Sequence, residues 1–228
     1  RVHLLSFMDH TPGQGQYRDI EMYLKTMKGY QDLSDAQIVQ VMEQKKSHDT
    51  LSFEDMKELS DLATRKGIAV AYHDDDSTEK IELAKRLGTT ISEFPIYMDV
   101  AKYAHQENIH TLAGAPNIML GGSHSGNLNA REAIEADCIS ILCSDYYPAS
   151  MLHGVFKLHQ QCDFPLVDAV RLITINPAKA VNMDDEIGSI KVGKKADINV
   201  IQMDGDYPMI TECIVNGFTV SRYHYRVD

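Results

Sequence analysis

Five short apolar segments recur along the chain of 228 residues, and stretches of helical character separate them. The segments show little alternation between apolar and polar positions, which is typical of strands buried on both faces of a parallel sheet. They are VHLLSFM at 2–8, IAVAY at 68–72, TISEF at 90–94, HTLAG at 110–114 and CISILCS at 138–144. The pattern therefore predicts an α/β protein with a parallel sheet.

The connections between these segments carry the signals of helix ends. Ser52 precedes a helical pattern that has Asp55 at the capping-box position, and Gly67 follows as a C-terminal stop. The segment STEKIELAKRLG at 77–88 has the same arrangement, and residues 17–66 contain three helical stretches. Repeated strand–helix units predict right-handed crossovers, as in a doubly wound sheet or a (β/α)8 barrel.

The pattern changes near residue 187, where short β-type runs punctuated by Gly and Asp begin. These runs are GSIKVGKKADINVIQMDGD and ECIVNGFTVSRYHYRVD. We therefore expect two domains, a (β/α) portion over residues 1–183 and a small β subdomain over residues 184–228.

The amino-acid composition argues against some classes of binding partner. The formal net charge of -11 and the absence of a Lys/Arg block argue against binding to nucleic acid or to anionic lipid. The longest apolar runs are too short for a membrane span, and no signal peptide is visible. The four cysteines lack a C-x-x-C pair, which favours reduced thiols and a cytoplasmic protein.

Polar residues follow the ends of the predicted strands, where barrel enzymes keep their working groups. His10, His73 and Asp145 suit a divalent metal such as zinc, since imidazole and carboxylate are its usual ligands. Asp9, Asp74 and Asp75 are candidates for orienting a ligand or for holding a second cation. Each residue also has an ordinary explanation, as a satisfied polar group, a helix cap or part of a solvated acidic loop.

The stretch GAPNIMLGGSHSGN at 114–127 has the small residues and donors of an anion cradle. A flexible glycine-rich loop is the alternative explanation. The candidate substrate-binding residues here are Asn117, Gly122, Ser123, His124, Ser125 and Asn127.

The C-terminal part of the chain resembles a known family. TINPAKAVNMDDEIGSIKVGKKADINVI at 174–201 and IVNGFTV at 214–220 are similar to the C-terminal signature of the amidohydrolase superfamily. This resemblance implies a (β/α)8 barrel with a metal site and a small β-sandwich formed by the chain ends. It also permits hydrolysis of a C–N bond, as in dihydroorotase-like or deaminase-like members.

Further motifs resemble the branch of this superfamily that acts in phosphonate metabolism. They are SFMDHTPGQGQYRD, YHDDDS, SEFP, GAPNIMLGGSHSGN and SDYYPASML. The resemblance implies metal-dependent hydrolysis of alpha-D-ribose 1-methylphosphonate 5-triphosphate to the 5-phosphate and pyrophosphate. The expected metal is zinc, with manganese or iron as alternatives.

The resemblance also implies roles for individual residues. His73 matches the fifth-strand ligand, and Asp145 matches the eighth-strand aspartate that binds metal and takes a proton from the attacking water. His10 lies near the fourth-strand ligand position, Glu93 stands where a histidine is usual, and Tyr146 joins the substrate-binding set.

The first-strand H-x-H or H-x-D pair of the superfamily is absent from the sequence. We therefore expect a partial or truncated barrel, about strands 4 to 8, followed by a β-sandwich segment. A non-catalytic binding or scaffolding component is a further alternative. A homodimer is also expected, because an open barrel exposes apolar strand edges.

Overall fold

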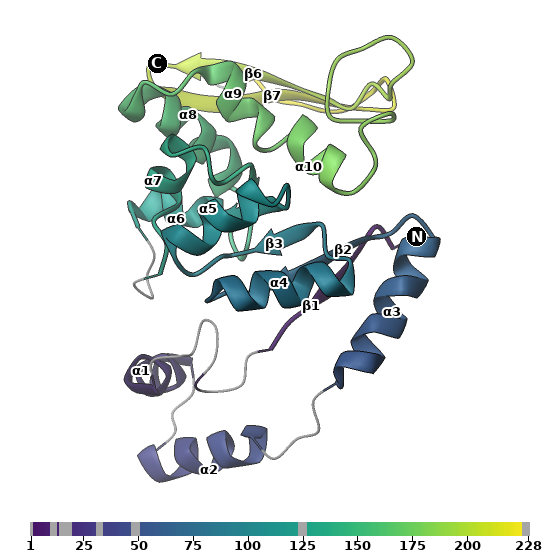
Figure 1. The fold of residues 1–228 in the computed structure, drawn as a ribbon. Helices are drawn as coiled ribbons and strands as arrows, with labels where there is room; N and C mark the ends of the chain where they lie inside the picture. The colour runs from purple at the N-terminus through teal and green to yellow at the C-terminus, as the bar shows by residue number, and fades with distance from the viewer. Residues whose placement is uncertain are drawn as a thin grey trace. The chain divides into compact units, whose positions relative to one another are not determined.

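The computed structural model describes residues 2–9, 13, 20–30, 34–46, 51–122 and 127–224 (Figure 1). These residues divide into two units. The first unit extends to Leu112 and includes residues 127 and 128, and the second comprises residues 113–122 and those from 129 onward. The expected domain boundary at residues 183 and 184 stays a prediction.

A parallel sheet organises the first unit, with neighbouring strands in the order β1-β2-β3-β4. All four strands were expected from the apolar segments, and the α/β class is confirmed. Their bounds are Leu4–Phe7 for β1, Ala69–His73 for β2, Ile91–Glu93 for β3 and His110–Gly114 for β4.

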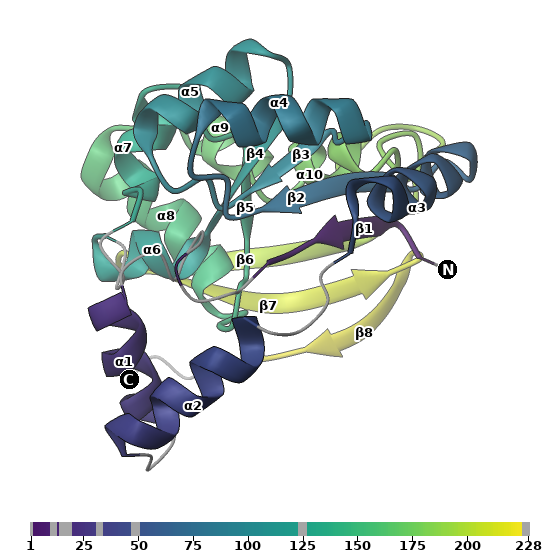
Figure 2. The ribbon, with the colours of Figure 1, turned by 60° about the horizontal axis from the view of Figure 1, so that its bottom comes forward.

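Helices α3 (Phe53–Arg65), α4 (Thr78–Leu87) and α5 (Met98–Gln106) belong to this unit, and Figure 2 shows α4 and α5 on one side of β2 and β3. Phe7 and Val70 pack with Ala63 of α3 and Leu87 of α4. Because side chains alternate along a strand, Ser6, Ala71 and His73 lie on the opposite face of the sheet. The sheet therefore has one helix-covered face and one face that carries polar groups.

The helix ends form as the sequence predicts. Ser52 and Asp55 make a reciprocal capping box at the start of α3, with the Ser52 side chain accepting from the Asp55 backbone N–H. Ser77 caps α4, and Gly88 ends it in the left-handed conformation.

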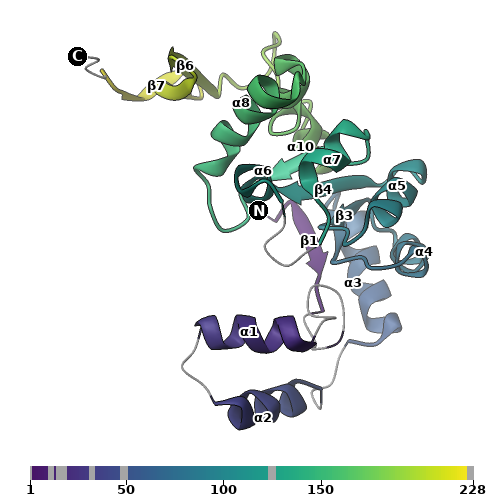
Figure 3. The same ribbon diagram turned by 90° about the vertical axis from the view of Figure 1, so that its left-hand side faces the viewer.

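Helices α1 (Ile20–Tyr30) and α2 (Asp35–Lys46) lie side by side in Figure 3. Tyr23, Ile38 and Met42 are buried between them, so the pair has a small core of its own. With α3 they account for the three helical stretches expected over residues 17–66.

The second unit contains strand β5 (Ile141–Cys143), several helices and a separate antiparallel sheet. The sheet has the order β6-β7-β8, with bounds Ile198–Asp204, Tyr207–Val215 and Phe218–Arg222. The helices are α6 (Ala115–Leu120), α7 (Ala130–Glu135), α8 (Ser150–Cys162), α9 (Leu166–Arg171) and α10 (Ile175–Ala180). The β-type runs expected after residue 187 are confirmed as strands from Ile198 onward.

Within this unit α8 packs on β7. The rings of His153 and Tyr207 have centroids 4.7 Å apart, and the Gln160 amide donates to the carbonyl oxygen of Asp206.

In the described part of the chain, no helix combines the length and the apolar character that a membrane crossing requires.

Candidate functional site

The carboxyl ends of β2 and β3 bring two of the predicted ligands together. His73 and Glu93 are register partners in adjacent parallel strands, so their side chains lie on the same face of the sheet. The Ser6 hydroxyl of β1 donates to Glu93 Oε2. This bond spans β2, in which Ala71 is the register partner of Ser6.

The imidazole of His73 is held between two neighbours. Its Nδ1 lies 3.2 Å from Asp74 Oδ2, and the Phe94 ring has its centroid 4.9 Å from that of His73. The side chains of His73 and Asp74 are only 11% and 4% exposed. This contact is electrostatic and does not have the geometry of a hydrogen bond. A carboxylate beside Nδ1 favours a ring orientation in which Nε2 is the nitrogen that would face a ligand.

The backbone adopts a rare conformation at three strand ends. Asp74, Phe94 and Asp145 have φ angles of 58°, 56° and 49°, and each follows one of the strands β2, β3 and β5 within two residues. A left-handed conformation costs about 1–2 kcal/mol for an L residue, and a bulky residue such as Phe rarely adopts it. Such residues concentrate at functional sites, which supports the ends of β2 and β3 in the first unit as the candidate site.

Asp75 is completely buried. The Ser92 hydroxyl donates to its Oδ2, whereas its Oδ1 has no hydrogen-bond partner among the described residues. Burial raises the pKa of the Asp75 carboxyl to about 6, against the lowering effects of the Ser92 hydrogen bond and of Lys80. A carboxylate in this position destabilises the fold when it is ionised.

The raised pKa of Asp75 predicts a pH-dependent effect of Asp75→Asn in metal-free protein. The folded state binds the Asp75 proton more tightly than the unfolded chain, so its contribution to stability falls as the pH rises from about 4 to about 6. Asp75→Asn should therefore raise the free energy of unfolding relative to wild type by about 2 kcal/mol more near pH 7.5 than near pH 4.5.

Urea unfolding at the two pH values, with a chelator present, measures this difference. Asp99→Asn, at an exposed aspartate of α5, is the matched control. An equal effect of Asp75→Asn at both pH values would contradict the prediction.

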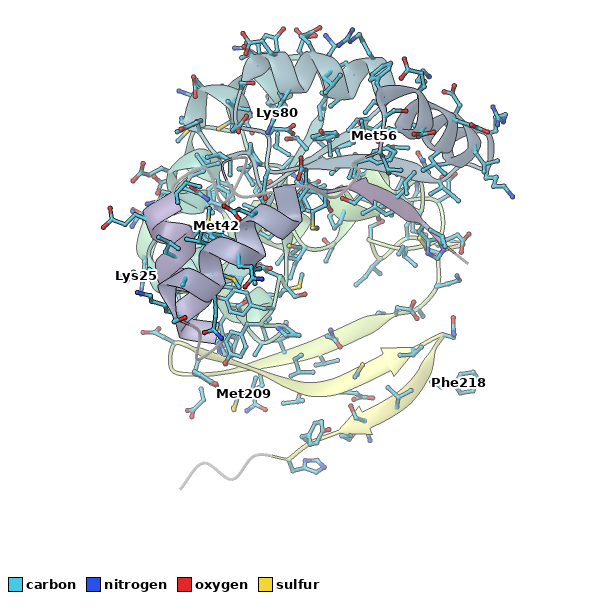
Figure 4. The ribbon with its side chains drawn as sticks, turned by 90° about the horizontal axis from the view of Figure 1, so that it is seen from below. Lys25, Met42, Met56, Lys80, Met209 and Phe218 are labelled. Carbon is cyan, nitrogen blue, oxygen red and sulfur yellow. The ribbon has the colours of Figure 1, made fainter. Side chains whose placement is uncertain are left out.

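The other acidic residues near β2 have separate surroundings. Lys80, which Figure 4 labels on α4, has its Nζ 3.2 Å from Asp76 Oδ2. Burial raises the pKa of Tyr72, and the charges of Asp75, Asp9 and Asp76 raise it further. The acidic run after β2 therefore contains a buried carboxylate beside an imidazole, a buried carboxylate that accepts from Ser92, and a carboxylate that is ion-paired with Lys80.

The second unit contains four of the other predicted residues. Asp145 and Tyr146 are exposed just after β5. Asn117 Oδ1 accepts from the Ala130 backbone N–H at 3.0 Å, so this side chain holds the start of α7, and the Gly122 N–H donates to the Asn117 carbonyl oxygen. Their proposed roles stay predictions.

Two of the remaining predicted residues are described in the first unit. Asn127 is half-buried there, and so is Asp9 after β1. His10, Ser123, His124 and Ser125 lie outside the described residues.

The donor set of the first unit suits a divalent cation in part. His73 and Glu93 provide a nitrogen and a carboxylate at adjacent strand ends, and the Asp74 carboxylate lies beside the imidazole. In the described ranges no group of three or more His, Cys, Asp or Glu side chains is placed to hold a metal ion.

Sequence reasoning missed three residues that shape this site, namely Ser6, Ser92 and Phe94. Ser6 interrupts the apolar strand segment LLSF, and Ser92 follows Ile91 within the strand segment of TISEF. A polar residue inside a buried strand was the signal that could have identified them. Nothing local marks Phe94, because its conformation follows from the fold.

Comparison with known proteins places the chain in a family. Residues 20–221 match the amidohydrolase family. The chain belongs to this family. It is 40% identical over 200 residues to the alpha-D-ribose 1-methylphosphonate 5-triphosphate diphosphatase of Escherichia coli K12, an alignment that covers 86% of this chain and 53% of that protein. The chain thus spans about half the length of this relative.

A further curated protein and a solved structure are also similar to this chain. An imidazolonepropionase of Fusobacterium nucleatum is 30% identical over 159 residues, covering 65% of this chain and 38% of that protein. Among solved structures, an amidohydrolase from Thermotoga maritima MSB8 has a TM-score of 0.62 at 18% identity, covering 96% of this chain and 62% of that chain. At this identity the structural similarity concerns the fold alone.

Proposed function

We propose that the protein is a metal-dependent hydrolase that cleaves alpha-D-ribose 1-methylphosphonate 5-triphosphate to the 5-phosphate and pyrophosphate. The observation that carries the proposal is the 40% identity to the Escherichia coli diphosphatase over 86% of this chain. The paired His73 and Asp74 and the neighbouring Glu93 support it, because they provide ligand chemistry where two parallel strands end.

His73 and Glu93 would hold a divalent cation, and His10 and Asp145 are the further ligands that we propose. Zinc fits the mixture of imidazole and carboxylate, and manganese or iron are alternatives. When bound, the cation supplies Lewis acidity and a positive charge that an acidic protein needs in order to hold a polyphosphate.

The residues of the chain have separate tasks in this proposal. Asp145 takes a proton from the attacking water, whose oxygen bonds to phosphorus as the bond between the α- and β-phosphoryl groups breaks. Pyrophosphate leaves, and the 5-phosphate remains on the ribose. Asp74 keeps the His73 ring in one orientation, so the ring does not have to reorient as charge develops during the reaction.

We propose that the substrate is bound by Gly122, Tyr146, Asn117 and Asn127, together with Ser123, His124 and Ser125. Backbone N–H groups of small residues suit phosphoryl oxygens, which supports this set. An ionised triphosphate does not cross a bilayer unaided, so we place the reaction in the cytoplasm. The homodimer expected from the sequence stays a prediction.

Hydrolysis of a C–N bond is the second candidate. The match to the imidazolonepropionase of Fusobacterium nucleatum favours it, as does 27% identity over 144 residues to a dihydroorotase of Methanopyrus kandleri. Both matches cover less of this chain than the match to the diphosphatase.

Product analysis of metal-loaded protein separates the candidates. With alpha-D-ribose 1-methylphosphonate 5-triphosphate we expect one pyrophosphate for each 5-phosphate formed, and a chelator should abolish the reaction. Imidazolonepropionate and dihydroorotate should stay intact. Ring opening would favour the second candidate, release of orthophosphate alone would contradict the proposed bond cleavage, and no turnover of any substrate would favour a binding component.

A further inference from the structure

Three hydrogen bonds fasten the turn after β2 to the end of β3. The Ser92 hydroxyl donates to Asp75 Oδ2, the Asp74 N–H donates to the Glu93 carbonyl oxygen at 2.8 Å, and the Ile96 N–H donates to the Asp75 carbonyl oxygen at 2.8 Å. Ser92 is 1% exposed and Asp75 is 0% exposed, so water does not compete for the bond between their side chains.

These bonds determine the direction of the chain after His73. In a continuous strand the side chain of Asp75 would lie on the same face as that of His73. The left-handed conformation of Asp74, with φ of 58°, instead turns the chain so that Asp75 meets Ser92. Ser92 is the register partner of Tyr72, on the helix-covered face of the sheet.

The same turn places the carboxylate of Asp74 beside the imidazole. Asp74 Oδ2 lies 3.2 Å from His73 Nδ1, and the Asp74 side chain is 4% exposed. The Ser92–Asp75 bond therefore lies one residue from the contact between Asp74 and His73.

Stability alone does not account for an aspartate at position 75. A buried carboxylate with one oxygen lacking a hydrogen-bond partner among the described residues destabilises a fold. Strained or costly polar groups of this kind persist where they hold a functional geometry.

We propose that Ser92 and Asp75 are positioning residues, whose hydrogen bond holds Asp74 in the turn that orients the His73 imidazole for metal binding. The proposal rests on the proposed function in one respect, the assignment of His73 as a metal ligand. Neither residue touches the reacting groups.

The variant that tests this proposal is Ser92→Ala, and Ser60→Ala is its matched control. Ser60 is also a fully buried serine of the first unit, and its hydroxyl donates to the Leu87 carbonyl oxygen, away from the turn. Both variants lose one buried hydrogen bond and should lose similar stability. A difference between them in the measurements below therefore depends on where the lost bond lies.

Two measurements compare these variants without the substrate. Hydrogen exchange at the Asp74 and Ile96 amides should become at least about tenfold faster in Ser92→Ala and change less than about threefold in Ser60→Ala. The affinity for Zn²⁺, measured by competition with a chelator, should fall about 10- to 100-fold in Ser92→Ala alone. Equal effects of the two variants on either measurement would overturn the proposal.

Asp75 provides a second test, which separates geometry from charge. Asp75→Asn keeps an oxygen that accepts from Ser92, so its Zn²⁺ affinity should stay within about threefold of wild type. Asp75→Ala removes the acceptor and should resemble Ser92→Ala. An equal loss of Zn²⁺ affinity in Asp75→Asn and Asp75→Ala would show a charge effect and overturn the proposal.

The outcomes distinguish this proposal from the proposed function. Wild-type protein that binds Zn²⁺ without releasing pyrophosphate counts against the diphosphatase reaction and leaves the positioning role intact. Wild-type protein that binds no Zn²⁺ overturns the positioning role, because there is then no metal for His73 to bind.

Discussion

Replacing His73 or Asp145 should lower kcat for pyrophosphate release by about a thousandfold or more. His73→Ala removes the imidazole that Asp74 orients at the end of β2, and Asp145→Asn removes the proposed proton acceptor. Asparagine is chosen at position 145 because it tolerates the left-handed conformation found there. Steady-state assays of pyrophosphate release, with thermal unfolding measured in parallel, check the prediction.

The chain offers a matched control for each substitution. His105→Ala removes an exposed histidine from α5, and Asp137→Asn changes an exposed aspartate that is also left-handed, with φ of 55°. Both controls should keep activity within about twofold of wild type. Near-normal turnover in a folded His73→Ala or Asp145→Asn protein would remove that residue from the site.

Replacing Gly188 with alanine should lower the free energy of unfolding by about 2–5 kcal/mol. Gly188 has φ of 85°, a conformation that alanine adopts only with strain. A Cβ at this position would lie 2.8 Å from Ala178 Cβ, 3.0 Å from Ile175 Cα and 3.1 Å from the Thr174 carbonyl oxygen. Backbone atoms of α10 form part of this contact, so the neighbouring atoms cannot move aside at a low cost in free energy.

Gly193→Ala is the control for backbone strain. Gly193 has φ of 94°, and no heavy atom would lie within 4 Å of an added Cβ. Its loss of stability should be about 1–2 kcal/mol, the cost of the left-handed conformation alone. Urea unfolding of both variants measures the difference, and equal losses would show that the close contact at Gly188 has no energetic effect.

The strands and helices could be predicted because their causes are local. Apolar segments such as IAVAY indicated β2, and the Ser52–Asp55 and Ser77–Gly88 pairs indicated the ends of α3 and α4. Capping bonds join residues a few positions apart, so sequence spacing alone identifies them.

The candidate site could be predicted only in outline. Parallel strands end at the same edge of a sheet, so the position of His73 and Glu93 at strand ends followed from the pattern. The bonds of Ser6 to Glu93 and of Ser92 to Asp75 join residues 87 and 17 positions apart, and they depend on strand order and register. The spacing of residues along the chain therefore does not predict which of these side chains come into contact.

The sequence by itself determined the alternation of strands and helices, the helix caps, the acidic charge and the run of His73 with three aspartates. Only the tertiary structure decided what each aspartate does. Burial raises the pKa of Asp75 to about 6 although the Ser92 hydrogen bond lowers it, the left-handed turn brings Asp74 to His73, and Lys80 pairs with Asp76. Solvent exclusion and through-space contacts set these properties, and both exist only once the strands are packed.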